Sequence, residues 1–260
     1  MSEGKLLVER DGAIGRMVFA NSARRNAING AMWRGIPDAI AHFNNDDEVR
    51  CIILRGEGEV AFAAGADISE FEKSRSTAEG VRAYEKAIDA AHSAIETSPK
   101  PVIALIHGFC VGGGVATALS CDLRYAGESA RFAIPAARLG LGYGVHGNGR
   151  LVATVGHACA REIMYTARRY DASEALAMGL VNRVMPDSEL DAYVEDLALG
   201  IAANAPLTVA ASKIAFESLI TPSGDFSAAG DAIKACMDSE DYVEGRRAFM
   251  EKRKPRFQGK

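Results

Sequence analysis

Two short segments rich in glycine and alanine have the residue types to hold an oxygen anion with backbone N–H groups. Gly112, Gly113 and Gly114 follow an apolar run at 101–106, and a second such segment spans residues 62–67. Small residues at the carboxyl end of a strand let backbone N–H groups face a ligand, and a helix that begins there adds its positive end. Two N–H groups on one oxygen would form an oxyanion hole for an enolate or tetrahedral intermediate. Close helix packing or an ordinary turn is the alternative explanation of the glycines.

Groups that could transfer a proton lie further along the chain, in the glycine-rich stretch at 139–148. Tyr143 and His146 are its candidates, and Asn148 could orient one of them. The stretch also matches the GxGxxG pattern, but without a clear strand before it we interpret that match as chance. At the end of the 101–106 run, His107 is expected to be a structural histidine.

The elements that must position these residues alternate between strands and helices in the first part of the chain. Asp11-Gly12 is a turn signal between two β-rich runs, and an apolar spacing of three and four residues predicts helices. After about residue 157, capping-box patterns at 171–174 and 188–191 predict further helices. We therefore expect an α/β protein with two regions, a core over 1–200 and a helical region over 201–260. The predicted strands are 6–9, 15–19, 51–54 and 101–106, and the predicted early helices are 30–43 and 81–95.

The amino-acid composition limits the kinds of partner that we expect for this protein. The 260 residues carry a net charge of −4, which argues against a nucleic-acid partner. Five cysteines without a CxxC pair predict free thiols and no metal site. The N-terminus lacks the features of a signal or transit peptide, and no run approaches the 18 or so apolar residues that span a bilayer. We expect a cytoplasmic protein with no membrane partner.

Several motifs in the same order resemble those of the crotonase superfamily, also called the enoyl-CoA hydratase/isomerase family, over nearly the whole chain. The resemblance implies a spiral of ββα units followed by a helical trimerisation region, assembled as a homotrimer or a dimer of trimers. It also implies an acyl-CoA thioester as substrate, with coenzyme A as part of that substrate and no other cofactor. The matching motifs are RNAI at 25–28, FAAGADI at 62–68, HGFCVGGG at 107–114, CDLR at 121–124, FAIP at 132–135, LG at 139–140 and the tail over 238–255.

Matched residue by residue, the family's two oxyanion donors fall on the backbone N–H groups of Ala66 and Gly113. The lysine that reaches a coenzyme A phosphate from a neighbouring subunit in some members corresponds to Lys252. For such basic residues a solvated surface charge is the alternative. The remaining residues that the resemblance places near the substrate or its coenzyme A are Arg24, Arg25, Ala64, Asp67, Ile68 and Gly112.

Two positions depart from the hydratases that the chain resembles. The glutamates that handle water in those enzymes correspond here to Ala116 and Ala136, and alanine cannot transfer a proton. A branch that decarboxylates methylmalonyl-CoA shares the tyrosine at Tyr143 but carries a histidine at Ala66. We expect a lyase acting through a thioester enolate, by decarboxylation or by hydration with a different acid and base. The alternatives are thioester or carbon–carbon hydrolysis with water activated by His146, and a catalytically silent acyl-CoA binder.

Overall fold

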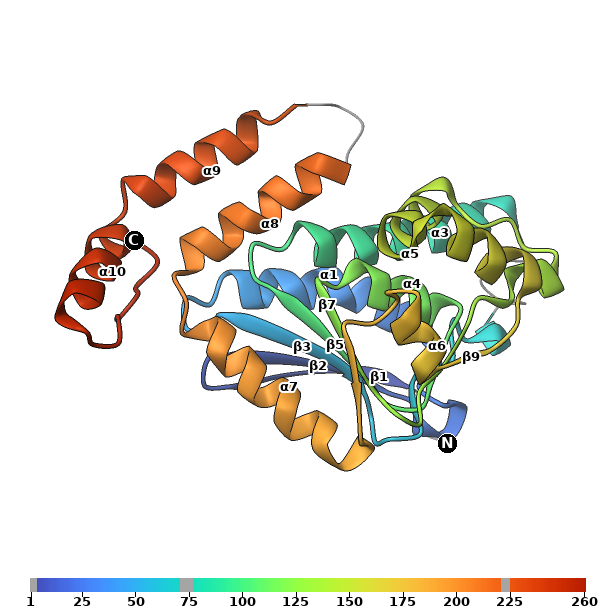
Figure 1. Ribbon diagram of the computed structural model, residues 1–260. Coiled ribbons are helices and arrows are strands. Elements are labelled where there is room, and N and C mark those ends of the chain that lie inside the picture. Colours follow the sequence, from blue (N-terminus) through green and yellow to red (C-terminus); the bar gives the residue numbers. More distant parts are fainter. Residues whose placement is uncertain (1–3, 71–76, 221–224) are drawn as a thin grey trace.

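A twisted six-stranded sheet forms the centre of the computed structural model, which describes residues 4–70, 77–220 and 225–260, without the side chain of Ile68 (Figure 1). Its first two strands form an antiparallel hairpin, and the strands that follow β2 are all parallel. The predicted strands and the turn at Asp11-Gly12 are therefore confirmed. In spatial order the strands are β1 (Lys5–Asp11), β2 (Ile14–Ala20), β3 (Cys51–Gly56), β5 (Val102–Ile106), β7 (Leu123–Gly127) and β10 (Arg183–Met185).

A second, four-stranded sheet consists of very short strands, each of two or three residues. Its first three strands each follow a strand of the large sheet directly along the chain, and a helix comes next. This repeated ββα order between residues 51 and 166 confirms the predicted spiral. The strands are β4 (Ala61–Ala63), β6 (Phe109–Val111), β8 (Arg131–Ala133) and β9 (Tyr170–Asp171).

Helices cover both faces of the large sheet, which explains why its central strands are continuous apolar runs. Alternate residues of β3 belong to different cores: Ile52 and Leu54 pack with the helices of one face, and Ile53 packs with α7 on the other. Figure 1 shows α7 alone below the sheet and the other core helices above it. The helices are α1 (Gly30–Asn44), α3 (Ala78–Thr97), α4 (Gly113–Ser120), α5 (Val145–Thr166), α6 (Ala172–Ala177) and α7 (Asp187–Ala202).

Two of the helix starts test the predicted capping boxes. The box at Asp171 and Glu174 is present, with both reciprocal hydrogen bonds. The box at 188–191 is wrong, because the N-cap of α7 is Pro186, two residues before Ser188, and this cap has no side-chain hydrogen bond. The Asp187 and Asp191 carboxylates bind His107 and, for Asp187, also Ser129.

The C-terminal helices α8 (Pro206–Ile220), α9 (Ser227–Met237) and α10 (Glu240–Glu251) form an arm that extends from the body in Figure 1. The arm exposes large apolar side chains, among them Phe249 at 86% and Leu219 at 70%. The division into regions 1–200 and 201–260 stays a prediction. Within the described residues no single helix is long and apolar enough to cross a bilayer, although α7 and α8, bent by 104°, pass that test as a pair.

Candidate active site

Ala66 and Gly113 lie close together where strands β4 and β6 end. These strands are parallel neighbours, so the loops that follow them lie at the same edge of the small sheet. A Cβ built on Gly113 would lie 3.4 Å from the Ala66 nitrogen. Hydrogen bonds on both sides of Ala66, from Ile28 N to Gly65 O (2.8 Å) and from Asp67 N to Ile28 O (2.9 Å), fix that loop without using the Ala66 N–H. Gly113 opens α4, so its N–H has no acceptor within the helix.

Each of the three consecutive glycines has its own structural reason. Gly112 has a φ of +52°, which side chains rarely allow, and a Cβ on Gly114 would lie 2.4 Å from the Ala63 carbonyl oxygen. A Cβ on Gly113 would lie 3.3 Å from the Trp33 ring. Gly112 is thus required by its backbone conformation and Gly114 by close packing, and of the three glycines only Gly113 borders the cavity described next.

A cavity of about 510 Å³ opens beside Gly113, between α1, α3, α4 and the start of α5. Ala116 lines it, whereas Ala136 is buried in the core at 4% exposure. Both Tyr143 and His146 line the same cavity, and their roles at an acyl pocket stay predictions. The other lining residues that the argument uses are Trp33, Glu85, Asp89, His92, Glu96, Ser120 and Arg150.

Tyr143 presents a buried hydroxyl whose oxygen has no hydrogen-bond partner in the part of the chain that the structure describes. Burial, with a smaller effect from Cys110, raises the pKa of Tyr143 to about 12. The hydroxyl is therefore a neutral donor at physiological pH. Leaving such a group unpaired costs stability. Asn148 donates to the Tyr143 backbone carbonyl (3.0 Å), so it orients the loop and not the phenol.

His146 contacts a carboxylate that the sequence did not single out. Its Nε2 lies 3.0 Å and 3.2 Å from the two carboxylate oxygens of Glu96, near the end of α3. The Glu96 side chain is 5% exposed. It also accepts a hydrogen bond from Ser120 Oγ (3.0 Å) and forms an ion pair with Arg150 (3.0 Å). The cavity therefore contains a histidine and a buried carboxylate in direct contact.

Arg150 connects this carboxylate to the arm. Its guanidinium makes two hydrogen bonds to Glu217 of α8, at 2.6 Å and 3.0 Å. Burial opposes the charge of Arg150, but the hydrogen bonds and charges of Glu217 and Glu96 raise its pKa overall. The guanidinium is committed to two carboxylates within the described structure.

His92 is a second histidine of the cavity wall that the sequence did not indicate. Thr117 donates its hydroxyl hydrogen to Gly113 O (2.8 Å), so the 3.3 Å contact between His92 Nε2 and Thr117 Oγ1 requires the histidine to donate. Burial, with a smaller effect from His146, lowers the pKa of His92 to about 4. A neutral His92 therefore supports the first turn of α4, where the Gly113 N–H projects.

Helical spacing was the available signal for both missed residues. His92 and Glu96 lie four residues apart on α3, the spacing that puts two side chains on one helix face. Ala91 and Ile95 are buried beside them, so a carboxylate there needs partners.

The residues expected near coenzyme A form internal contacts around the first loop. Arg24 bonds the Asp67 carboxylate (2.6 Å), and the Arg25 guanidinium lies 4.7 Å from the centre of the Phe109 ring. Burial alone would raise the pKa of Asp67, but hydrogen bonds from Ser69 and Arg24 hold that pKa below its usual range. Asp67 thus stabilises the loop, while binding of coenzyme A by Arg24 and Arg25 stays a prediction.

Three other predicted residues have less defined settings. Ala64 donates its N–H to Arg25 O (2.9 Å), which ties the loop to residue 25. Lys252 is exposed at the C-terminal cap of α10, in the arm. The side chain of Ile68 lies outside what the structure describes.

His107 is the structural histidine that the sequence predicted, because it is buried and both ring nitrogens bond carboxylates of α7 (3.1 Å to Asp187 and 2.8 Å to Asp191).

Known proteins resemble this chain in both sequence and fold. Residues 9–260 match the family described as enoyl-CoA hydratase/isomerase. A short-chain-enoyl-CoA hydratase from Clostridium acetobutylicum is 37% identical over 98% of this chain and 97% of that protein. A methylmalonyl-CoA decarboxylase from Escherichia coli is 32% identical over 93% of each. A crystal structure described as an enoyl-CoA hydratase/carnithine racemase, from Magnetospirillum magneticum, superposes with a TM-score of 0.94 at 38% identity and covers 100% of this chain and 97% of that one.

Proposed function

The chain belongs to the enoyl-CoA hydratase/isomerase family, and on that premise we propose that it adds water to a 2-enoyl-CoA thioester. The thioester oxygen binds between the N–H groups of Ala66 and Gly113. Attack of water on C3 of the acyl chain moves an electron pair onto that oxygen and gives an enolate. The two donors and the positive end of α4 favour this enolate over the ground state.

The observation that carries this proposal is the position of Gly113. It borders the cavity that contains His146 and Glu96, and it also lies beside the Ala66 nitrogen. Gly113 and His146 thus border one space, and the nearby Ala66 nitrogen supports an oxyanion site at its edge. In the same cavity Ala116 contributes no acid, so the hydration differs from the two-glutamate route in its acid and base.

Charge favours hydration over decarboxylation. Among the described lining residues Glu85, Asp89 and Glu96 are acidic, and the Arg150 guanidinium is already paired with Glu96 and Glu217. An acyl group with its own carboxylate would meet these acids without an uncommitted arginine to bind it.

Decarboxylation is the second candidate, because one observation favours it. The buried Tyr143 hydroxyl has no acceptor among the described residues, and a carboxylate on the acyl group would supply one. The methylmalonyl-CoA decarboxylase relative makes that chemistry accessible to the family.

Product analysis with a panel of enoyl-, malonyl-type and β-keto-CoA thioesters tests the proposal. Mass spectrometry distinguishes gain of one water, loss of carbon dioxide and release of free coenzyme A. Hydration of an enoyl-CoA is the expected result. Turnover of malonyl-type substrates alone would replace hydration with decarboxylation, release of coenzyme A would indicate a hydrolase, and binding without turnover would indicate a silent homologue.

The arm supports a proposal about assembly. Its exposed apolar side chains include Phe216, Leu219, Phe249 and Met250, each at least 67% exposed. Such a surface is typical of a subunit interface. We expect a homotrimer or a dimer of trimers, which light scattering coupled to size-exclusion chromatography would measure. A monomer at micromolar concentration would contradict this expectation.

A further inference from the structure

Glu96 is a buried carboxylate that the proposed oxyanion chemistry does not use. A buried carboxylate is costly unless its oxygens are satisfied. Both oxygens of Glu96 are engaged by His146, and Ser120 and Arg150 add one contact each. Its side chain therefore has a fixed position at the wall of the cavity.

The contact with Glu96 determines which nitrogen of His146 carries the hydrogen. An ionised carboxylate only accepts hydrogen bonds, so Nε2 must be the donor when the imidazole is neutral. Nδ1 then carries the lone pair. The His146 side chain is 59% exposed at the start of α5, so this nitrogen remains accessible to water and substrate.

The Glu96 carboxylate shares its arginine with a second acid. Glu96 and Glu217 are two carboxylates around the single guanidinium of Arg150, which leaves one net negative charge in the group. Glu85 and Asp89 of α3 add further negative charge at the cavity wall, and His92 is neutral there. The His146 ring is therefore a further polar partner for a carboxylate that Arg150 balances only in part.

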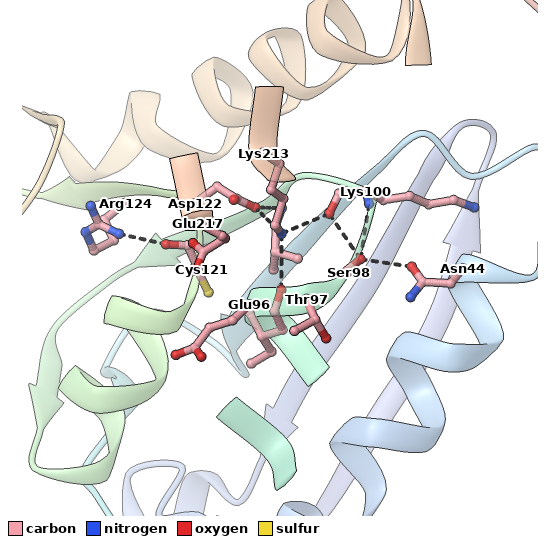
Figure 2. A network of polar contacts seen from close by, with 12 residues as sticks. Asn44, Glu96, Thr97, Ser98, Lys100, Cys121, Asp122, Arg124, Lys213 and Glu217 are labelled. Carbon is pink, nitrogen blue, oxygen red and sulfur yellow. Dashed lines mark hydrogen bonds and ion pairs between the residues drawn. The ribbon is translucent and has the colours of Figure 1, made fainter. Parts of the chain in front are cut away.

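The arm anchors the backbone on which Glu96 lies. Figure 2 shows Lys213 of α8 reaching the end of α3 and the residues that follow it. Its buried Nζ donates to Ile95 O (3.1 Å) and contacts Asp122 Oδ2 (2.8 Å). Glu217, one turn further along α8, bonds Arg150. One face of α8 thus fixes both the main chain beside Glu96 and the charge beside its carboxylate.

We propose that Glu96 is the positioning residue that holds His146 as the single acid–base group of the reaction. The proposal rests on the hydration proposed above. Nδ1 of His146 accepts a proton from water as the water oxygen bonds to C3 and the C2–C3 double-bond electrons move into the thioester enolate. The same nitrogen then returns that proton to C2 as the enolate collapses. The sum is the addition of one water, and His146 ends in its starting form.

Two pairs of variants test this assignment. His146→Ala is compared with His157→Ala, which changes an exposed histidine of the same helix. Glu96→Gln is compared with Glu79→Gln, which removes an exposed charge from the first turn of α3. We expect kcat to fall by about 100-fold or more in His146→Ala. Misorientation in Glu96→Gln should cost on the order of 100-fold in kcat, with little change in KM. The controls keep wild-type rates.

A loss confined to kcat separates positioning from mere structural support, because a collapsed cavity wall would also raise KM. Because Glu96→Gln can unfold the cavity wall, Ser120→Ala provides a milder variant that removes one hydrogen bond to Glu96. This variant should give a smaller loss in kcat, again with little change in KM.

A nitrogen-15 NMR measurement reads the tautomer without any substrate. We expect His146 to carry its hydrogen on Nε2 in the wild type, and a larger share of the Nδ1–H form in Ser120→Ala. A wild-type His146 that carries its hydrogen on Nδ1 would overturn the assignment. So would an unchanged kcat in folded Glu96→Gln and Ser120→Ala. If the wild type turns over no thioester, the hydration proposal fails, whereas turnover lost in Gly113→Pro but kept in His146→Ala contradicts only the acid–base assignment.

Discussion

Replacing Gly113 with proline removes one proposed oxyanion donor at a position where the fold accepts proline. Gly113 is the first residue of α4, where proline is favoured because its missing N–H has no helical acceptor. The substitution also adds a Cβ, which would lie 3.3 Å from the Trp33 ring. A loss of activity in this variant alone would therefore mix two causes.

Gly113→Ala is the matched control because it adds the same Cβ and keeps the N–H. The cost of contact with Trp33 is shared by both variants, so their difference isolates the donor. Loss of one oxyanion donor costs about 100- to 1000-fold in kcat, or roughly 2.7–4 kcal/mol. Since Ala66 still donates, we expect measurable residual turnover in Gly113→Pro.

The assay measures kcat/KM on the thioester that the product panel identifies, with circular dichroism and urea unfolding to show that both variants are folded. We expect Gly113→Ala to retain most of the activity and Gly113→Pro to lie at least about 100-fold below it. Equal kcat/KM values for the two folded variants would refute the reasoning, because the N–H of residue 113 would then contribute nothing to the transition state.

Three further predictions concern the cavity and the sheet. Ala116→Glu places a carboxylate in the cavity and should raise crotonyl-CoA hydration measured by absorbance; an unchanged rate in this variant would show that the acyl group lies elsewhere. Ala136→Glu buries a carboxylate in the core and should lower the free energy of unfolding by at least about 2 kcal/mol. Tyr143→Phe removes a buried hydroxyl with no partner among the described residues, so Tm should stay the same or rise, and a lower Tm would contradict this. In the same variant kcat/KM should fall roughly 3- to 10-fold, the equivalent of one hydrogen bond. Burial opposes protonation of His107, but hydrogen bonds to Asp191 and Asp187 raise its pKa overall. Its contribution to stability is complete below its ordinary pKa near about 6.5 and is lost as pH rises through the folded value. Urea unfolding should show this decline in the wild type and a weaker one in His107→Gln.

The sequence was sufficient for the long elements of the fold. Helix α1 spans Gly30–Asn44 where the spacing predicted 30–43, and the apolar runs at 51–54 and 101–106 became central strands. These elements bury many apolar residues in the protein core, so their apolar pattern in the sequence is strong. The strands of the small sheet have at most three residues, which is too short for any periodicity, and only the order of the family motifs indicated them.

Site prediction failed where the contacts cross the chain. Tyr143 and His146 could be proposed from the sequence because they stand in one glycine-rich stretch, and their catalytic roles stay predictions. Glu96 was not, since Ser120 and His146, its partners, lie 24 and 50 residues away, and nothing local to α3 shows that its carboxylate is satisfied. The absent cap at Ser188 has a similar cause: the neighbouring carboxylates of Asp187 and Asp191 serve Ser129 and His107, which come from other parts of the fold.

The pairing of Arg150 with Glu217 constrains how this chain can exchange segments with its relatives. A recombination point between residues 150 and 217 would leave Glu96 and Arg150 together but give Arg150 a foreign α8 in place of the one that carries Glu217. Such a chimera would keep the entire glycine segment and both loop amides, because these come from the first half of the chain. The guanidinium that contacts Glu96 would keep its second partner only if the grafted α8 also has a carboxylate at position 217.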